Sequence, residues 1–241
     1  MSEARAAGPW AQTVPAAEAT YTLYPVFRGY TELRDALEGA DDRARYALAH
    51  EIEDAFASWE GITVRGSYST VGFRSDADLV LWLVGPSPED LQKALVDFRR
   101  TEVGRLMDVS WTFMGVVKPA EFTADHAPAF IKGDPPGAYL CVYPFVRTPE
   151  WYLLPKEERA QLLADHGVMG REFPDVLANT TSAFGLGDWE WILAFESDRL
   201  DRIVECIRRL REAEARRYTK EEVPFITGIR KDVVDLLDDL A

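Results

Sequence analysis

Tyrosine, arginine and histidine side chains that could act together lie close to one another in the second half of the chain. The segment YLCVYPFVR (139–147) predicts a β-strand, in which alternation places Tyr143 and Arg147 on the same face. Residues from about Pro155 to Phe173 follow the spacing of an amphipathic helix, and His166 lies in its apolar stripe. A phenol, a guanidinium and an imidazole on neighbouring elements indicate a lined pocket.

Gly167 and Gly170 flank this histidine in the predicted helix. A glycine inside a helix costs about 1 kcal/mol relative to alanine, so the pair indicates that something bulky approaches the backbone. A lone histidine in an apolar stripe is nevertheless more often a core residue than a ligand. No further ligand lies at the spacing of a zinc site, whereas haem iron needs only one imidazole because the macrocycle supplies four nitrogens.

Other polar and aromatic residues have simpler explanations. His50 falls in an earlier predicted helix, lacks adjacent glycines and precedes the charged sequence EIED, so we interpret it as structural. Trp151, Trp189 and Trp191 are expected to be packing residues first. The sequence contains no nucleophile elbow and no phosphate-binding glycine loop, since GFRSD and GLGDW resemble hairpin turns.

The overall composition favours a soluble globular protein. Its 241 residues suffice for one large domain or two small ones. A net charge of −14 argues against nucleic acid and anionic membranes, which need a basic footprint. Cys141 and Cys206 lie in apolar segments without a CxxC pair, which predicts buried free thiols in a reducing compartment. With no apolar run of about 20 residues and no signal-peptide pattern at its start, the chain is expected to be cytoplasmic.

The order of predicted elements occurs twice, which indicates an internal duplication. The pentapeptides YPVFR (24–28) and YPFVR (143–147) each begin a series of strand, helix, strand, helix and strand. The first long helix is expected from about Asp35 to Trp59. Polar turns near Ser67–Gly72 and Thr180–Gly185 predict hairpins, which gives four strands in each half. This is the split βαβ, ferredoxin-like arrangement.

Each predicted sheet has helices on one face only, so its other apolar face must be covered, and the partner sheet is the obvious cover. The predicted fold class is therefore α+β, with duplicated ferredoxin-like halves forming a dimeric α+β barrel. The acidic end is expected to be a short solvated helix. The expected boundaries are a disordered tail at 1–19, an N-terminal half at 20–119, a connecting loop at 120–137, a C-terminal half at 138–232 and the acidic end at 233–241.

The stretch YPFVRTPEWYLLPKEERAQLLADHGVMGREF, with DWEW downstream and EARRYTKEEVPFITGIR near the end, resembles the coproheme decarboxylases. These enzymes belong to the chlorite dismutase-like superfamily, and the actinobacterial branch is the most similar. The resemblance covers about residues 20 to 231. It implies the duplicated barrel, usually as a homopentamer, and the last step of coproporphyrin-dependent haem biosynthesis. In that step hydrogen peroxide drives decarboxylation of propionates 2 and 4 of Fe-coproporphyrin III, through harderohaem, to haem b.

The resemblance also implies roles for single residues, with the porphyrin as both substrate and redox cofactor. His166 matches the proximal iron ligand. Tyr143 matches the catalytic tyrosine, whose radical abstracts hydrogen from a propionate. His126 matches the distal histidine of the actinobacterial branch, which would accept a proton from incoming peroxide; an ordinary imidazole pKa of about 6.5 suits that task.

Basic residues are implied as propionate ligands. Arg147 matches one of them, and Arg211 matches another more loosely, with Arg208 and Arg209 as rivals. Trp151 lies beside the site in the same pattern. Because one tyrosine serves two propionates, the porphyrin is expected to rotate between steps. We further expect the porphyrin to lie between the two sheets, and the chain to make a transient contact with the coproporphyrin ferrochelatase.

Four alternatives within the same fold remain to be separated. A chlorite-splitting enzyme uses a distal arginine after the proximal helix, but the sequence has no arginine between Arg171 and Arg199. A haem-binding peroxidase of the dye type, or a small monooxygenase with similar halves, would not need Tyr143. A non-enzymatic haem carrier would keep His166 and could dispense with Tyr143.

Overall fold

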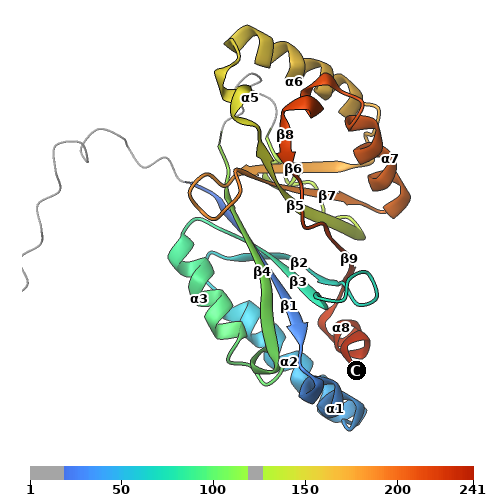
Figure 1. Cartoon of the computed structure of the whole chain (residues 1–241). Helices are drawn as coiled ribbons and strands as arrows, with labels where there is room; N and C mark the ends of the chain where they lie inside the picture. Colours follow the sequence, from blue (N-terminus) through green and yellow to red (C-terminus); the bar gives the residue numbers. More distant parts are fainter. Residues whose placement is uncertain (1–18, 119–126) are drawn as a thin grey trace, which may run out of the picture.

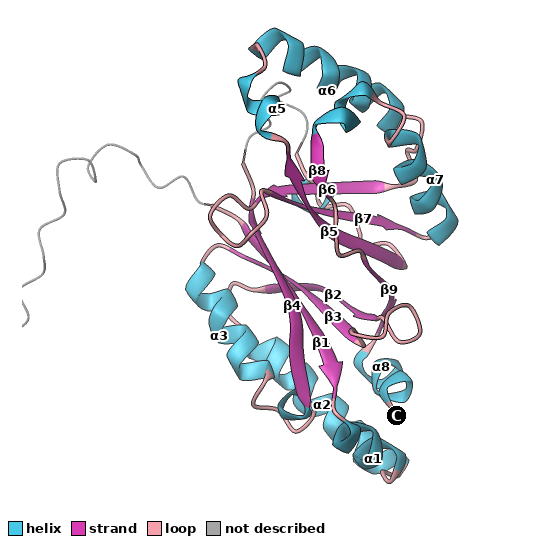
Figure 2. Cartoon of the chain, in the orientation of Figure 1, coloured by secondary structure: helices cyan, strands magenta, loops and turns pink. Residues whose placement is uncertain are grey.

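The computed structural model describes residues 19–118 and 127–241, so the expected N-terminal tail falls almost wholly outside it. Each half consists of an antiparallel sheet with helices on its outer face, and the two sheets face each other (Figure 1). Figure 2 shows the resulting layers in the order helices, sheet, sheet, helices. Within the described ranges, no helix is long and apolar enough to cross a bilayer.

The N-terminal half has the spatial strand order β4-β1-β3-β2, and its three α-helices cover one face of that sheet. Local signals explain its boundaries: for example, Ser87 caps the third helix by accepting a hydrogen bond from the Asp90 amide, and Pro88 follows as its first residue. The elements are β1 (Tyr21–Gly29), α1 (Thr31–Glu38), α2 (Asp42–Ser58), β2 (Thr63–Ser69), β3 (Leu79–Gly85), α3 (Pro88–Phe98), η2 (Gly104–Leu106) and β4 (Met107–Val116).

The C-terminal half repeats this plan with the strand order β6-β7-β5-β9. Its hairpin turn contains Gly185 at φ 76°, a left-handed conformation that favours glycine. After α4 (Ala129–Lys132) in the connection, the elements are β5 (Tyr139–Arg147), α5 (Pro149–Leu153), α6 (Lys156–Gly170), β6 (Leu177–Ser182), β7 (Trp191–Ser197), α7 (Leu200–Leu210), η3 (Glu214–Tyr218), β8 (Thr219–Glu221), β9 (Ile226–Lys231) and α8 (Val233–Leu240).

Two seams join the sheets into one closed barrel. β2 pairs with β9 in a register that includes Ser67 opposite Lys231, and β4 meets β6 where Val116 lies opposite Ser182. Closure leaves neither four-stranded sheet with a free edge at these seams. The predicted fold class, α+β with duplicated ferredoxin-like halves forming a barrel, is confirmed.

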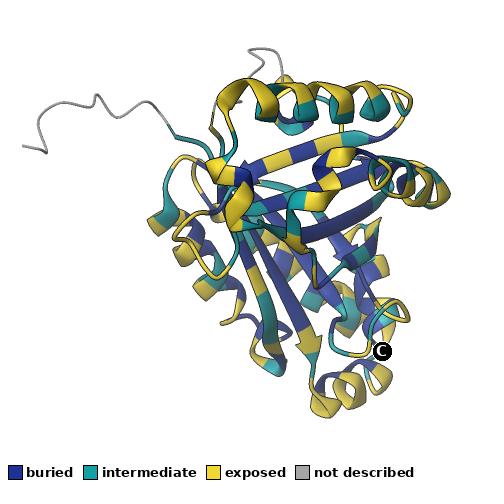
Figure 3. Cartoon of the chain, turned by 45° about the horizontal axis from the view of Figure 1, so that its top comes forward, coloured by how far each residue is buried: buried dark blue, intermediate teal, exposed yellow. Residues whose placement is uncertain are grey.

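The space between the sheets is filled by protein side chains. Tyr24, Trp82 and Val142 are among the fully buried residues of this layer, in which the Tyr24 and Trp82 rings lie 5.0 Å apart. The buried residues gather on the strands, whereas the outer faces of the helices are exposed (Figure 3). The expectation that a porphyrin lies between the two sheets is therefore wrong, because alternate residues of both sheets already form a packed core there.

The two tyrosine-proline pentapeptides are not structurally equivalent, although the halves are. Tyr21 pairs with the last residue of β3, and Tyr139 pairs with the last residue of β7. Counting from these positions, Tyr24 corresponds to Val142 and not to Tyr143. A shift of one residue reverses the face of a strand, so Tyr24 lies in the layer between the sheets and Tyr143 packs on the helix side.

The single helix expected from about Asp35 to Trp59 is instead two helices. α1 ends before Gly39, and Asp41 begins α2 by accepting a hydrogen bond from the Ala44 amide at 2.8 Å. Because an N-cap residue has extended backbone angles, the helix cannot run continuously through Asp41.

The C-terminal helix α8 is also not the solvated helix that the acidic composition predicts. Asp232 caps it, and its apolar residues pack into the core of the N-terminal half beside α1 and α2. The last residues of the chain therefore complete the first half of the fold. The buried residues are Val233, Leu236, Leu237 and Leu240.

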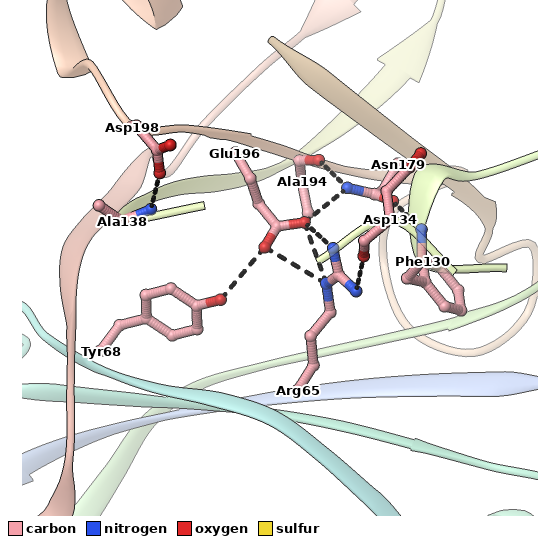
Figure 4. A network of polar contacts seen from close by, with 9 residues as sticks. All are labelled: Arg65, Tyr68, Phe130, Asp134, Ala138, Asn179, Ala194, Glu196 and Asp198. Atoms are coloured by element: carbon pink, nitrogen blue, oxygen red, sulfur yellow. Dashed lines mark hydrogen bonds and ion pairs between the residues drawn. The ribbon is translucent and has the colours of Figure 1, made fainter. Parts of the chain in front are cut away.

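A buried ion pair joins the two halves (Figure 4). Arg65 of β2 donates from Nη2 to Oε2 of Glu196 in β7 at 2.7 Å. Tyr68 and Asn179 donate to the same carboxylate at 3.3 and 3.1 Å. The Glu196 side chain is fully buried, and this burial raises its pKa while the guanidinium opposes the shift.

The same network fixes the end of the connection between the halves. Arg65 donates from Nη1 to the Asp134 carbonyl at 3.0 Å, and the Phe130 amide donates to Oδ1 of Asn179 at 3.0 Å. Residues 127–137 of the connecting loop are thus held by both sheets, and they include the short helix α4 rather than irregular chain alone.

Replacing Glu196 by alanine should lower the free energy of unfolding by about 3 kcal/mol, because it leaves the Arg65 guanidinium buried without its anion. Urea denaturation measures this change. The matched control is Asp201→Ala, which breaks an exposed pair with Arg199 and should cost less than about 1 kcal/mol. Equal losses in the two variants would contradict a structural role for the buried pair.

Candidate functional site

Tyr143 lies in the middle of β5 on the face that packs against α7, with 5% of its surface exposed. Its ring stacks on Phe225 at a centroid distance of 4.3 Å and tilts against Phe195 at 6.1 Å. Burial raises the pKa of its hydroxyl well above the usual value. The phenol is therefore neutral at physiological pH and keeps a hydrogen atom to give.

Arg147 ends β5 and is held on two sides. Its Nη1 donates to the Ala215 carbonyl at 3.0 Å, and its guanidinium carbon lies 4.2 Å from the ring centroid of the buried Trp151. Burial lowers the pKa of Arg147 to about 10, so the guanidinium stays charged at neutral pH. Trp151, which the sequence predicts to be a packing residue, thus positions the Arg147 guanidinium.

Arg211 lies at the C-terminal end of α7, close to the tyrosine. Its guanidinium lies 5.8 Å from the Phe225 ring, on which Tyr143 stacks, and its positive charge lowers the pKa of Tyr143 against the larger effect of burial. Of the two rivals, Arg208 is exposed on α7, and Arg209 pairs with Glu172 at 2.8 Å. The structure therefore brings Arg211, rather than Arg209, towards the phenol.

One carboxylate connects these basic groups. Glu222 bonds to Nη2 of Arg211 at 3.2 Å and forms an ion pair with Arg216 of η3. Its negative charge adds to the rise of the pKa of Tyr143, and it partly offsets the lowering of the pKa of Arg147 by burial. Tyr143 and the three arginines therefore share one electrostatic environment around Glu222, on the helix side of the C-terminal sheet.

His166 lies half-buried on α6, which packs against α7 and η3, the elements beside Arg211 and Arg216. None of the 15 residues of α6, all of them described, is buried, whereas α3 and α7 each bury apolar residues. A helix that carries Leu162 and Met169 but buries neither is incompletely packed. This loose packing suits a large, flat, apolar group placed against α6.

The two glycines beside His166 agree with this fit. A methyl group added at Gly167 would lie 3.7 Å from its nearest neighbour, Nη1 of Arg171, and one at Gly170 would lie 3.9 Å from Cδ2 of Leu210. Both distances are ordinary van der Waals contacts, so packing within the described chain does not require glycine there. The residues present fit a porphyrin with His166 as its iron ligand.

Of the other two histidines, only His50 lies among the residues that the structure describes. His126 lies outside the described residues, so its role as the distal base stays a prediction. His50 is exposed on α2, where its Nδ1 lies 3.0 Å from Oε2 of Glu53 one turn away.

Cys141 and Cys206 are free and buried, as the sequence predicts. Burial raises the pKa of each thiol to about 11. Both are therefore protonated and poorly nucleophilic at neutral pH, and they pack beside Tyr143 rather than react.

Three charged residues near the site escape prediction from the sequence: Arg216, Glu222 and Glu190. Glu190 of the DWEW motif accepts a hydrogen bond from the Tyr152 hydroxyl at 2.5 Å and another from the Arg147 amide at 2.7 Å. It therefore anchors the end of β5. The motifs DWEW and EARRYTKEEVPF contain all three, but only the fold reveals which charges meet.

An open cavity of about 480 Å³ lies in a different place, between α2 and the seam of β2 and β9. Its lining includes Glu53, Arg230 and Lys231 but neither Tyr143 nor His166. Of its lining residues, Lys231 pairs with Asp239 at 2.6 Å and Glu53 pairs with His50 at 3.0 Å. The candidate site around Tyr143 is therefore distinct from this cavity.

The sequence matches the family model described as chlorite dismutase over residues 45–231. It is 51% identical over 182 residues to a coproheme decarboxylase of Mycolicibacterium smegmatis, covering 75% of this chain and 79% of that protein. A coproheme decarboxylase of Thermus thermophilus is 29% identical over 190 residues, or 74% of each chain.

The fold is similar to that of a chlorite dismutase from Candidatus Nitrospira defluvii solved in complex with imidazole. The TM-score is 0.79, with 24% identity over 91% of this chain and 94% of that one. At this identity the likeness bears on the fold alone.

Proposed function

The chain belongs to the chlorite dismutase family, and we propose that within it the chain is a coproheme decarboxylase, as its relatives in M. smegmatis and T. thermophilus are. It is an enzyme that converts propionates 2 and 4 of Fe-coproporphyrin III to vinyl groups through harderohaem, with haem b as product. Each step releases one carboxylate as CO2 and one hydrogen from the side chain. The two electrons removed reduce one hydrogen peroxide to two waters.

The observation that supports this function best is the position of Tyr143. A neutral, buried phenol lies in the same electrostatic environment as Arg147, Arg211 and Arg216, on the side of the sheet that also carries the loosely packed helix of His166 (Figure 1). Decarboxylation needs this combination, because a hydrogen donor must be held close to a carboxylate that cations keep still. A haem-binding peroxidase or a non-enzymatic haem carrier of the same fold has no need for it.

Each residue has a distinct role in the proposal. The bound iron porphyrin supplies the oxidising power when peroxide reacts with it. His166 holds the iron from the α6 side. Tyr143 gives up its hydrogen atom and then takes one from the propionate, while Arg147 and Arg211 hold propionates. Trp151 keeps the Arg147 guanidinium in place through its ring face.

Mixing the purified protein with Fe-coproporphyrin III and hydrogen peroxide, followed by chromatography and mass analysis of the porphyrins, tests the function. We expect harderohaem to appear first and haem b to accumulate, with two peroxides consumed for each haem b. Tight porphyrin binding without conversion would support the carrier instead. Oxidation of an added phenol without loss of propionates would support the peroxidase.

His126 is proposed as the base that accepts the proton of incoming peroxide. Replacing it by alanine should slow decarboxylation by about 100-fold near pH 8. The loss should be smaller below the ordinary imidazole pKa of about 6.5, where the wild-type base is itself protonated. Initial rates between pH 5.5 and 9 would show this. A variant whose profile keeps the wild-type shape would contradict the assignment.

The proposal also covers the compartment and the partners of the enzyme. The buried free thiols Cys141 and Cys206 suit a reducing compartment such as the cytoplasm. From the family resemblance we also propose a homopentamer and a transient contact with the coproporphyrin ferrochelatase, which delivers the iron porphyrin.

A further inference from the structure

Glu222 places its carboxylate against arginines that, in the proposed function, bind a propionate of the substrate. It bonds to Arg211 at 3.2 Å and forms an ion pair with Arg216, and its side chain is only 19% exposed. Both arginines are considerably more exposed, at 47% and 40% of their side chains. The two guanidiniums therefore present an accessible side to a ligand while an internal anion neutralises them.

Glu222 lies among several cations. Arg147 is close enough for both Glu222 and Arg216 to affect its pKa, and Glu222 and Arg211 affect that of Tyr143 in opposite directions. A propionate that reaches Tyr143 from the side of Arg211 and Arg216 must approach this carboxylate. Two carboxylates on the same pair of arginines repel each other, so one of them must yield.

We propose that Glu222 is a resident counter-ion of the propionate-binding arginines, displaced when a substrate carboxylate binds and restored when that carboxylate has been removed. This inference rests on the proposed function. Its consequence is selectivity between substrate and product. The competing carboxylate in this proposal is the reacting propionate at position 2 or 4, which must break the pairs of Glu222 in order to bind. Haem b keeps its other two propionates but has vinyl groups at positions 2 and 4, so it leaves those pairs intact.

The Glu222 carboxylate thus weakens substrate binding. After decarboxylation it pairs again with Arg211 and Arg216, so that neither guanidinium is left without an anion. An enzyme gains nothing from holding a substrate more tightly than its transition state requires. Glu222 thus gives specificity through repulsion. It weakens the binding only of ligands that bring a carboxylate to these arginines.

The test is Glu222→Gln, which keeps the shape of the side chain and removes its charge. Fe-coproporphyrin III and haem b are titrated separately into the full-length protein without peroxide, and the absorption change of the porphyrin gives each Kd. We expect the Kd of Fe-coproporphyrin III to fall by about tenfold, while that of haem b changes by less than about twofold.

Glu214→Gln is the matched control. Glu214 also pairs with an arginine of η3, Arg217, but it is well exposed, with 67% of its side chain accessible. The control removes the same charge from the same region, so it accounts for any general gain in affinity for an anionic porphyrin. Neither Kd should change by more than about twofold in this variant.

Weaker binding of Fe-coproporphyrin III by Glu222→Gln would overturn the inference, since Glu222 would then serve to orient the arginines. Equal tightening for both porphyrins, or no change in either, would also overturn it. Should Glu222→Gln fail to fold, as judged by circular dichroism, Glu222→Ser provides a shorter neutral side chain with the same expectation.

The proposed function and this inference fail in different ways. If the wild-type protein with peroxide leaves Fe-coproporphyrin III unconverted, the proposed function fails. If it converts the substrate but the ratio of the two Kd values is the same in wild type and Glu222→Gln, only the counter-ion role fails.

Discussion

The variant Tyr143→Phe should bind Fe-coproporphyrin III with a Kd within about twofold of wild type but decarboxylate it on the order of 1,000-fold more slowly, a loss of about 4 kcal/mol of transition-state stabilisation. Phenylalanine keeps the ring that stacks on Phe225 at 4.3 Å, so the local packing survives. It removes the O–H group, and with it the hydrogen atom that the mechanism requires.

Chromatography of the porphyrins at fixed times after peroxide addition measures this loss. Tyr152→Phe is the matched control, because Tyr152 also lies in the C-terminal half and donates its hydroxyl to Glu190 at 2.5 Å. That variant should keep most of the activity. Conversion to haem b at the wild-type rate by Tyr143→Phe would refute the role of Tyr143.

The variant His166→Ala should bind the iron porphyrin at least about tenfold more weakly and lose activity on the order of 1,000-fold. Removal of even an outer partner of a metal ligand costs about 10–100-fold in affinity, and removal of the ligand itself costs no less. The iron would lose its axial imidazole, so the absorption spectrum of the complex should shift.

His50→Ala is the control for this experiment, since His50 is exposed on α2 and contacts Glu53 on its own helix. Its spectrum and activity should match those of wild type. Added imidazole should restore much of the spectrum of His166→Ala by entering the space of the lost side chain. A spectrum of His166→Ala identical to that of wild type would exclude His166 as the ligand.

The fold was largely predictable because its signals are local and occur twice. Alternating strands, hairpin turns and amphipathic helices can each be recognised in a short window of sequence, and their order specifies two ferredoxin-like halves. The break between α1 and α2 was missed, although Gly39 and the N-cap Asp41 are ordinary boundary signals. For α8, the acidic composition suggests a solvated helix. The helical spacing of its apolar residues is the signal for burial, and these residues are Val233, Leu236, Leu237 and Leu240.

The register of the repeat could not be deduced from matching letters. YPVFR and YPFVR look equivalent, but the pairing of β1 with β3 and of β5 with β7 shifts them by one residue. That single step decides whether a tyrosine lies in the core between the sheets, as Tyr24 does, or beside the helices, as Tyr143 does.

The candidate site divides in the same way. Tyr143, Arg147 and His166 could be proposed from one stretch of sequence, because a strand and the helix after it carry them. Glu222 could not, because its importance comes from contacts with Arg211 and Arg216 that only the folded chain creates. The role of such a charged residue depends on its tertiary contacts, which no sequence motif specifies.

A crystal structure of the protein with Fe-coproporphyrin III would show where the substrate binds and which residues contact it. We expect the macrocycle on the helix side of the C-terminal sheet, with iron bound to His166 and the Tyr143 hydroxyl within hydrogen-bonding distance of a propionate. A porphyrin seated in the cavity between α2 and the seam of β2 and β9, or one whose propionates all lie far from Tyr143, would contradict this expectation.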